Sequence, residues 1–161
     1  MYFVGIDVGT GSVRAALVSH AGEIFAQASR PIQTWTYEED SRLYEQSSAQ
    51  IWHALAECVR TLVEQSRVRP EEVHGIGFDA TCSLVAVQKV TGQPHCITPQ
   101  HLTQNSERNV ILWADHRAED EARLINAVHH KVLEYGGGTM SLEMEMPCLL
   151  YTSDAADERS S

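Results

Sequence analysis

The residues best suited to chemistry in this 161-residue chain lie in its first turn. An acid, Asp7, closes an apolar stretch of strand type, and a turn rich in glycine and hydroxyl groups follows: Gly9, Thr10, Gly11 and Ser12. Glycines let the backbone approach an anion closely, and exposed amides and hydroxyls can donate to phosphate oxygens. Because Asp7 would repel a phosphate, we expect it to hold Mg²⁺, which takes carboxylate and phosphate oxygens together.

The same turn allows other interpretations. An ordinary β-hairpin would use the glycines for its turn alone, and Gly-Thr-Gly by itself does not separate the two. A P-loop would need a Gly-Lys-Ser/Thr ending, which does not follow. A dinucleotide-binding fingerprint would need a third glycine where Arg14 stands, and a helix where a second apolar strand follows. The whole pattern over residues 7–14, Asp-x-Gly-Thr-x-Ser-x-Arg, is more specific than its glycines.

Bulk composition excludes several classes of partner. The formal net charge of −10 and a pI near 5.1 argue against nucleic acid or an anionic membrane as the main partner. No apolar run is long enough to cross a bilayer and Met1 leads directly into a strand, so we expect a cytoplasmic protein. Four scattered cysteines predict reduced thiols rather than a disulfide framework or a zinc site: Cys58, Cys82, Cys96 and Cys148.

Apolar patterning predicts a mixed sheet. The first three predicted strands form an antiparallel meander, and the stretches of strand type are residues 2–8, 12–20, 24–29, 73–78, 83–87 and 109–113. Residues 30–46 show no period and are expected to be a loop. Strands followed by helices in this order indicate a ribonuclease-H-like α/β domain with helices on the sheet faces.

Two helices are predicted. The first begins at a capping box in residues 47–50, where Ser47 and Gln50 would each take an end amide, and ends near Gln65. Cys58 should be buried in its apolar face, and Trp52 is expected in the core. The second runs from an N-cap at Asp115 to about residue 128, and its inward residues should be Leu124, Ile125 and Val128.

Four segments together resemble the FGGY carbohydrate kinases, and among them the D-ribulokinase and ribulokinase-like group. The resemblance is carried by residues 5–14, 44–52, 75–84 and 110–118, and it extends through 136–147. It implies an actin-like ATPase fold, with residues 1–147 forming part of the first lobe. Residues 148–161 match nothing in the family, and we expect them to be a non-native or disordered tail.

The resemblance implies an ATP-dependent kinase that phosphorylates a ketopentose such as D-ribulose, with ATP and Mg²⁺ as its cofactors. Asp7 would orient the metal, the glycines and hydroxyls of the turn would bind phosphate, and Arg14 would brace the hairpin. The positions that would face the sugar are Asp79, Thr81, Cys82, Ser83, Trp113 and Glu143. Asp79 could instead cap the turn after its strand, and Trp113 could instead be buried in the core.

The sequence leaves the roles of several residues, and the catalytic base, unassigned. Glu45 and Gln46 could border the pocket or cap the first helix, whereas Asp115 and Arg117 are expected to pair with each other rather than meet substrate. The catalytic base of the family lies beyond the end of this chain, so no catalytic residue is named and the chain alone should be inactive. A non-enzymatic nucleotide-binding or interaction module of the actin and Hsp70 type is the alternative.

Overall fold

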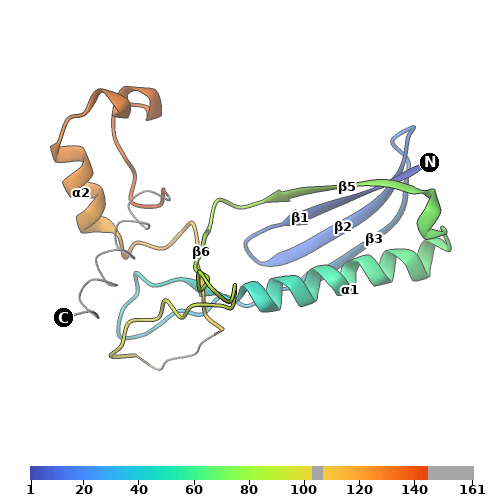
Figure 1. Cartoon of the computed structure of the whole chain (residues 1–161), viewed down its shortest axis with the longest axis horizontal. Helices are drawn as coiled ribbons and strands as arrows, with labels where there is room; N and C mark the ends of the chain where they lie inside the picture. The colour runs from blue at the N-terminus through green and yellow to red at the C-terminus, as the bar shows by residue number, and fades with distance from the viewer. Residues whose placement is uncertain (103–106, 145–161) are drawn as a thin grey trace. The chain divides into compact units, whose positions relative to one another are not determined.

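The computed structural model describes residues 1–102 and 107–144 (Figure 1). The chain forms two compact units. The sheet unit comprises Met1–Thr34 and Ser47–Thr81, and the loop unit comprises Trp35–Gln46 and the residues from Cys82 onward. Within the described ranges, no helix has the length and apolar character that a membrane crossing requires.

The sheet unit is built on four strands in the order β3-β2-β1-β5. These strands are β1 (Tyr2–Val8), β2 (Ser12–Ser19), β3 (Ile24–Pro31) and β5 (Val73–Ala80). The first three pair antiparallel, which confirms the predicted meander, and β5 lies parallel to β1 at the edge of the sheet. The result is the mixed sheet that the element order predicts.

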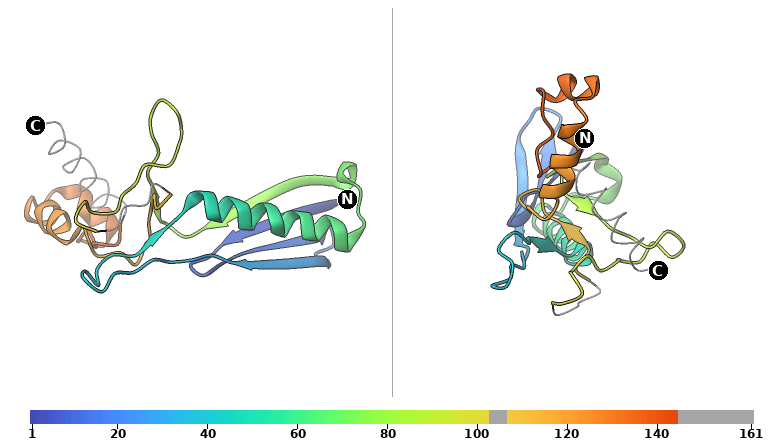
Figure 2. Two further views of the ribbon diagram at one scale, coloured as in Figure 1. Left: turned by 90° about the horizontal axis from the view of Figure 1, so that it is seen from below. Right: turned by 90° about the vertical axis from the view of Figure 1, so that its left-hand side faces the viewer.

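One face of this sheet is covered by helix α1 (Ser48–Ser66), which packs mainly on β2 and β3 (Figures 1 and 2). The helix buries Ala54, Cys58 and Leu62 against strand residues that include Val13 and Leu17. Cys58 is therefore buried, as its position in the apolar stripe predicts. Trp52 is not in the core, because its place on the flank of the stripe leaves it 64% exposed.

The start of α1 confirms half of the predicted capping box. Ser47 is the N-cap, and its hydroxyl accepts the Gln50 amide at 3.2 Å. The Gln50 side chain does not reach back to the cap. Its Oε1 accepts the amide of Gln33, just after β3, at 2.7 Å, so it ties the helix to the neighbouring chain segment instead.

The second face of the sheet follows from strand alternation. Along β1, Val4 and Ile6 are buried toward α1, whereas Gly5 and Asp7 point to the opposite face. The fold class is confirmed as a partial α/β domain with a mixed sheet. Within residues 1–102 and 107–144, α1 is the α-helix of the sheet unit, and it covers one face of the sheet.

The loop unit has much shorter strands. Three antiparallel two-residue strands lie in the order β4-β7-β6, and they are β4 (Glu45–Gln46), β6 (Leu84–Val85) and β7 (Val110–Ile111). The predicted strands at residues 83–87 and 109–113 therefore exist but are shorter, and the expected loop of 30–46 ends in a strand. Helix α2 (Glu119–Ala127) and the 3₁₀ segment η2 (Lys131–Gly136) follow; a shorter one, η1 (Pro70–Glu72), precedes β5 in the sheet unit.

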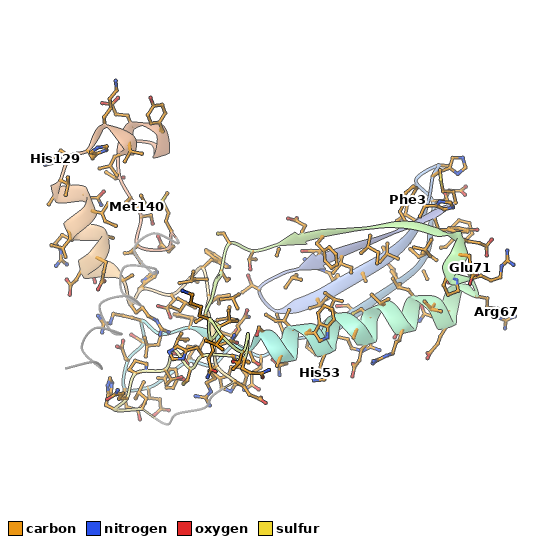
Figure 3. The ribbon with its side chains drawn as sticks, viewed as in Figure 1. Phe3, His53, Arg67, Glu71, His129 and Met140 are labelled. Carbon is orange, nitrogen blue, oxygen red and sulfur yellow. The ribbon has the colours of Figure 1, made fainter. Side chains whose placement is uncertain are left out.

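Helix α2 differs from its prediction at its start and in its inward face. It begins at Glu119 with Ala118 as N-cap, so Asp115 is not the cap. Its fully buried residue is Ala122, whereas Leu124 is 63% exposed and Val128 also lies at the surface. The Asn126 side chain, near the helix end, exchanges two hydrogen bonds with the backbone of Met140, which Figure 3 labels.

Candidate functional site

The turn between β1 and β2 is a hairpin at the carboxyl edge of β1. The Gly9 amide donates to the Ser12 carbonyl at 3.0 Å, and the Gly11 carbonyl accepts the Ile32 amide at 3.1 Å. The hairpin is therefore fixed at both sides by backbone hydrogen bonds. The Gly9 amide is therefore already used within the hairpin and is not available to an anion.

The two turn glycines serve different purposes. A Cβ on Gly9 would lie 3.3 Å from Nη2 of Arg14 and 3.4 Å from the Ser12 carbonyl oxygen, so this glycine permits close packing within the hairpin. A Cβ on Gly11 would meet no atom within 4 Å, and the Gly11 φ angle is not in the positive region. Neither packing nor backbone conformation requires glycine there, and the space beside it is open.

Asp7 and Arg14 face each other across β1 and β2 in register. Their side chains form an ion pair of 2.7 Å between Asp7 Oδ2 and Arg14 Nη2. Both remain partly exposed, so the pair contributes little to stability by itself. Its geometry is that of a brace across the hairpin, which is the role that the sequence predicts for Arg14.

The end of β5 lies at the same edge, because β5 runs parallel to β1. Asp79 pairs in register with Asp7, and the Thr81 amide extends the ladder by donating to the Val8 carbonyl at 3.1 Å. The Asp79 Oδ1 accepts the amide of Ala80 at 3.0 Å. This bond is local to the end of β5, and both predicted roles of Asp79, a cap of the following turn and a sugar contact, remain predictions.

A hollow of about 680 Å³ lies over the strands of the sheet unit, and sequence reasoning did not predict it. Its lining residues are Gly5, Ile6, Asp7, Arg14, Ala15, Ala16, Gln27, Ala28 and Ser29. The small side chains at Gly5 and Ala16 leave the space open on the face turned away from α1. A signal was available, because both small residues alternate with buried ones along their strands.

In the loop unit, the structure brings together two of the predicted sugar-facing residues. The Trp113 amide donates to the Ser83 hydroxyl at 3.3 Å. Trp113 is 43% exposed, so it is not a core residue. Cys82, the neighbour of Ser83, is exposed and is not in a disulfide.

Glu143 lies beside His116, with 3.4 Å between Glu143 Oε1 and His116 Nε2. Its other carboxylate oxygen accepts the Ser141 hydroxyl. That hydrogen bond is the main cause of a lowered pKa of Glu143, and the nearby His116 adds to it. Glu143 is therefore an ionised acceptor at neutral pH, as a hydroxyl-binding side chain should be.

The loop unit contains a buried ionic network. Arg117 donates to both oxygens of Asp115 at 2.8 Å and to Glu45 Oε1 at 3.0 Å. Burial lowers the pKa of Arg117, but the hydrogen bonds and charges of Asp115 and Glu45 outweigh it and leave that pKa raised. The predicted Asp115–Arg117 pair is confirmed. Glu45 neither borders a pocket nor caps α1, because its side chain is 0% exposed and holds Arg117.

The predicted site residues thus fall into two groups. Asp7, the turn residues and Asp79 to Thr81 belong to the sheet unit, whereas Cys82, Ser83, Trp113 and Glu143 belong to the loop unit. Sequence reasoning missed the role of Glu45.

The sheet unit places two carboxylates, Asp7 and Asp79, in register at the carboxyl edge of β1 and β5. The residues described contain no cluster of three or more His, Cys, Asp or Glu side chains placed to hold a metal. Mg²⁺ bound with nucleotide phosphates usually needs only one or two protein carboxylates, the other ligands being phosphate oxygens and water. Asp7, beside the hairpin, fits that requirement.

Comparison with known proteins shows the family of this chain. Residues 2–144 match the model of the FGGY family of carbohydrate kinases, N-terminal domain. The chain belongs to this family. Its FGGY relatives include a D-ribulokinase of Saccharomyces cerevisiae, 47% identical over 91% of this chain and 20% of that protein. A human FGGY carbohydrate kinase domain-containing protein is 46% identical over 95% of this chain and 26% of that protein.

Solved structures agree on the fold. A xyloylose kinase of Brucella ovis matches with a TM-score of 0.73 at 20% identity, over 98% of this chain and 30% of that one. A xylulose kinase of Rhodospirillum rubrum matches with a TM-score of 0.61 at 21% identity, over 80% of this chain and 23% of that one. The chain spans about a fifth of the length of the Saccharomyces D-ribulokinase and about a quarter of that of the human protein.

Proposed function

We propose that this FGGY domain is the part of a ketopentose kinase that binds the phosphates of ATP and contacts the sugar. The whole enzyme would transfer the γ-phosphate of ATP to a hydroxyl of a D-ribulose-like sugar. The observation that carries the proposal is the hairpin at the carboxyl edge of β1, with Asp7 in register with Arg14 and open space above Gly11. The D-ribulokinase relative supplies the sugar class.

Each group of residues has a role in that proposal. The Thr10 and Ser12 hydroxyls and the Gly11 amide would donate to phosphate oxygens, and Asp7 would hold Mg²⁺. When bound, the ion would neutralise charge that develops on the transferred phosphoryl group. Cys82, Ser83 and Glu143 would meet sugar hydroxyls, and Trp113 would pack on the sugar carbons.

The proposal further holds that the 161-residue chain does not turn over by itself. Phosphoryl transfer needs a base or positioning group for the acceptor hydroxyl and a site for the rest of ATP. No acid of the chain is assigned as that base. Binding without turnover is therefore the expected behaviour of the isolated chain.

A chimera tests the proposal directly. Residues 1–144 would replace the matching region of the Saccharomyces D-ribulokinase, and ATP-dependent phosphorylation would be measured with D-ribulose, L-ribulose, D-xylulose and glycerol. We expect D-ribulose to be the best substrate, and Asp7→Asn to lower kcat/KM by about 100-fold or more. Asp40→Asn in the loop unit is the matched control and should leave the rate unchanged.

Two results would contradict the proposal. One is a folded chimera that phosphorylates none of the four sugars, or that prefers glycerol. The other is turnover by the 161-residue chain alone. If the chimera does not fold, binding of Mg²⁺–ATP to the isolated chain, followed by NMR at the hairpin amides, decides whether the turn binds phosphate.

A further inference from the structure

We propose that Glu45 is a positioning residue for the sugar-facing segment of the loop unit, and that it acts on Trp113 through Arg117 and Asp115. The part of this inference that concerns sugar rests on the proposed function. The part that concerns the placement of Trp113 rests on contacts among described residues of one unit.

Glu45 is held by three donors in the interior. Its Oε1 accepts Arg117 Nη2 at 3.0 Å, and its Oε2 accepts the hydroxyls of Tyr37 and Thr98, each at 2.6 Å. Its side chain is inaccessible to solvent, so it cannot touch a sugar. A buried carboxylate of this kind has a single favourable arrangement, because any other one leaves a charge or a donor without a partner.

Arg117 transmits that arrangement. Its Nη1 donates to the Ile97 carbonyl at 2.9 Å, while Nε and Nη2 donate to the two oxygens of Asp115. The planar guanidinium is thus held on three sides, and its fork aligns the Asp115 carboxylate in one orientation. Lysine could not reproduce this geometry, because it lacks the fork.

Asp115 connects the buried network to the exposed segment. Its Oδ2 accepts the Tyr44 amide at 2.7 Å, and its own amide closes a turn onto the Leu112 carbonyl at 2.9 Å. Trp113 lies inside that turn and donates its amide to Ser83. The orientation of Asp115 therefore fixes the turn that presents Trp113 beside Ser83.

This arrangement does more than stabilise the unit. Apolar side chains of similar volume would fill the same space with equal or better stability. They would not supply the turn with hydrogen bonds of defined geometry, such as the one from the Tyr44 amide to Asp115. The structure thus assigns Glu45 to the placement of Trp113 rather than to binding or catalysis.

The test uses ¹⁹F NMR of the 161-residue chain labelled with 5-fluorotryptophan. The three tryptophan resonances are assigned by single Trp→Phe variants. We expect Glu45→Gln to move or split the Trp113 resonance by more than its linewidth and to leave Trp52, which lies in the sheet unit, unchanged. Thr98→Val removes one hydrogen bond to Glu45 and should move Trp113 in the same direction by less.

Two controls separate positioning from stability. Glu57→Gln removes a second Glu–Arg pair of the same 3.0 Å length, at the surface of the sheet unit, and should leave Trp113 unchanged. Leu133→Ala destabilises the loop unit at a buried apolar position and should also leave Trp113 unchanged while the unit is folded. A shift in Trp113 with Leu133→Ala equal to that with Glu45→Gln would overturn the inference.

D-Ribulose titration of the same samples tests the link to the sugar. In the wild type, D-ribulose should shift the Trp113 resonance, and Glu45→Gln should weaken that response about tenfold, equivalent to about 1.4 kcal/mol. If the wild type gives no response, the proposed sugar site fails while the ligand-free spectra still decide the role of Glu45. If Glu45→Gln unfolds the unit, Thr98→Val decides, and an unmoved Trp113 in that variant overturns the inference.

Discussion

The two units of this FGGY domain hold themselves together by different means. The sheet unit buries an apolar core between α1 and long strands, and its ion pairs, such as Arg30–Glu57, lie at the surface. The loop unit has two-residue strands and an interior that includes charged groups, among them the pair Arg117–Glu45. The two Arg–Glu pairs have the same N–O distance of 3.0 Å. Any difference in their contributions to the free energy of unfolding must therefore come from their burial.

The largest effect expected from this difference is in the loop unit. Arg117→Met leaves Glu45 and Asp115 buried without their cation, and we expect it to lower the free energy of unfolding by about 3–5 kcal/mol. Urea unfolding followed by tryptophan fluorescence in a Trp52→Phe background reports on this unit alone.

The matched variant for that prediction is Arg30→Met in the sheet unit. Its pair with Glu57 is exposed, so the loss should be at most about 1 kcal/mol. Equal losses in the two variants would show that burial does not separate the two pairs.

The core of the sheet unit should respond to apolar truncation instead. Leu62→Ala removes a buried side chain between α1 and the strands and should cost about 2–5 kcal/mol. Leu124→Ala on exposed α2 is the control and should change stability by less than about 0.5 kcal/mol. Amide hydrogen exchange measures both changes in stability, at the α1 amides for Leu62→Ala and at the α2 amides for Leu124→Ala.

A smaller effect depends on pH. The Arg42 guanidinium, by its hydrogen bond to the carboxylate, lowers the pKa of Asp40 from 3.8 to about 2. A folded pKa below the unfolded value stabilises the folded state above pH 3.8, and that contribution is lost as the pH falls through 2. Because Arg42 is half-exposed, we expect Asp40→Asn to cost about 1 kcal/mol at pH 7.

The pH series provides its own check. The difference between wild type and Asp40→Asn should shrink steadily between pH 4 and pH 2, in urea titrations at constant ionic strength. A difference that stays constant over this range would assign the effect to the shape of the side chain and not to its charge.

The smallest expected effect concerns thiol reactivity, where the units again differ. Burial raises the pKa of the Cys58 thiol, whose Sγ donates to the Val13 carbonyl, whereas Cys82 in the loop unit is exposed. Iodoacetamide labelling followed by peptide mass mapping should show Cys58 reacting about 100-fold more slowly than Cys82. Leu62→Ala should accelerate Cys58 alone, and equal initial rates would contradict the buried position.

The same contrast explains what the sequence could predict. In the sheet unit, apolar residues alternate over seven or eight positions, and this pattern predicts the bounds of β1 and β2 within one residue. The capping box likewise predicts Ser47 as the N-cap of α1. In the loop unit, two-residue strands carry no period. The sequence predicts Asp115 as an N-cap, whereas its carboxylate accepts the amide of Tyr44, 71 residues away, and no local pattern records that contact.

The candidate site follows the same rule. The hairpin around Gly9 and Gly11 was predictable, because its chemistry lies within eight consecutive residues. The family resemblance predicts that Ser83 and Trp113 both face the sugar, but not that they contact each other, since 30 residues separate them. The role of Glu45 depends on Arg117, 72 residues away, and could be found only from the structure.

Among residues 1–102 and 107–144, strand β5 has a neighbour on one side only, β1, so it lies at the edge of the four-stranded sheet. Its exposed Ile76 and Phe78 add apolar surface to a row of backbone groups that another extended chain can match. The isolated domain should therefore self-associate as its concentration rises, and dilution or a bound strand-forming peptide should reverse it.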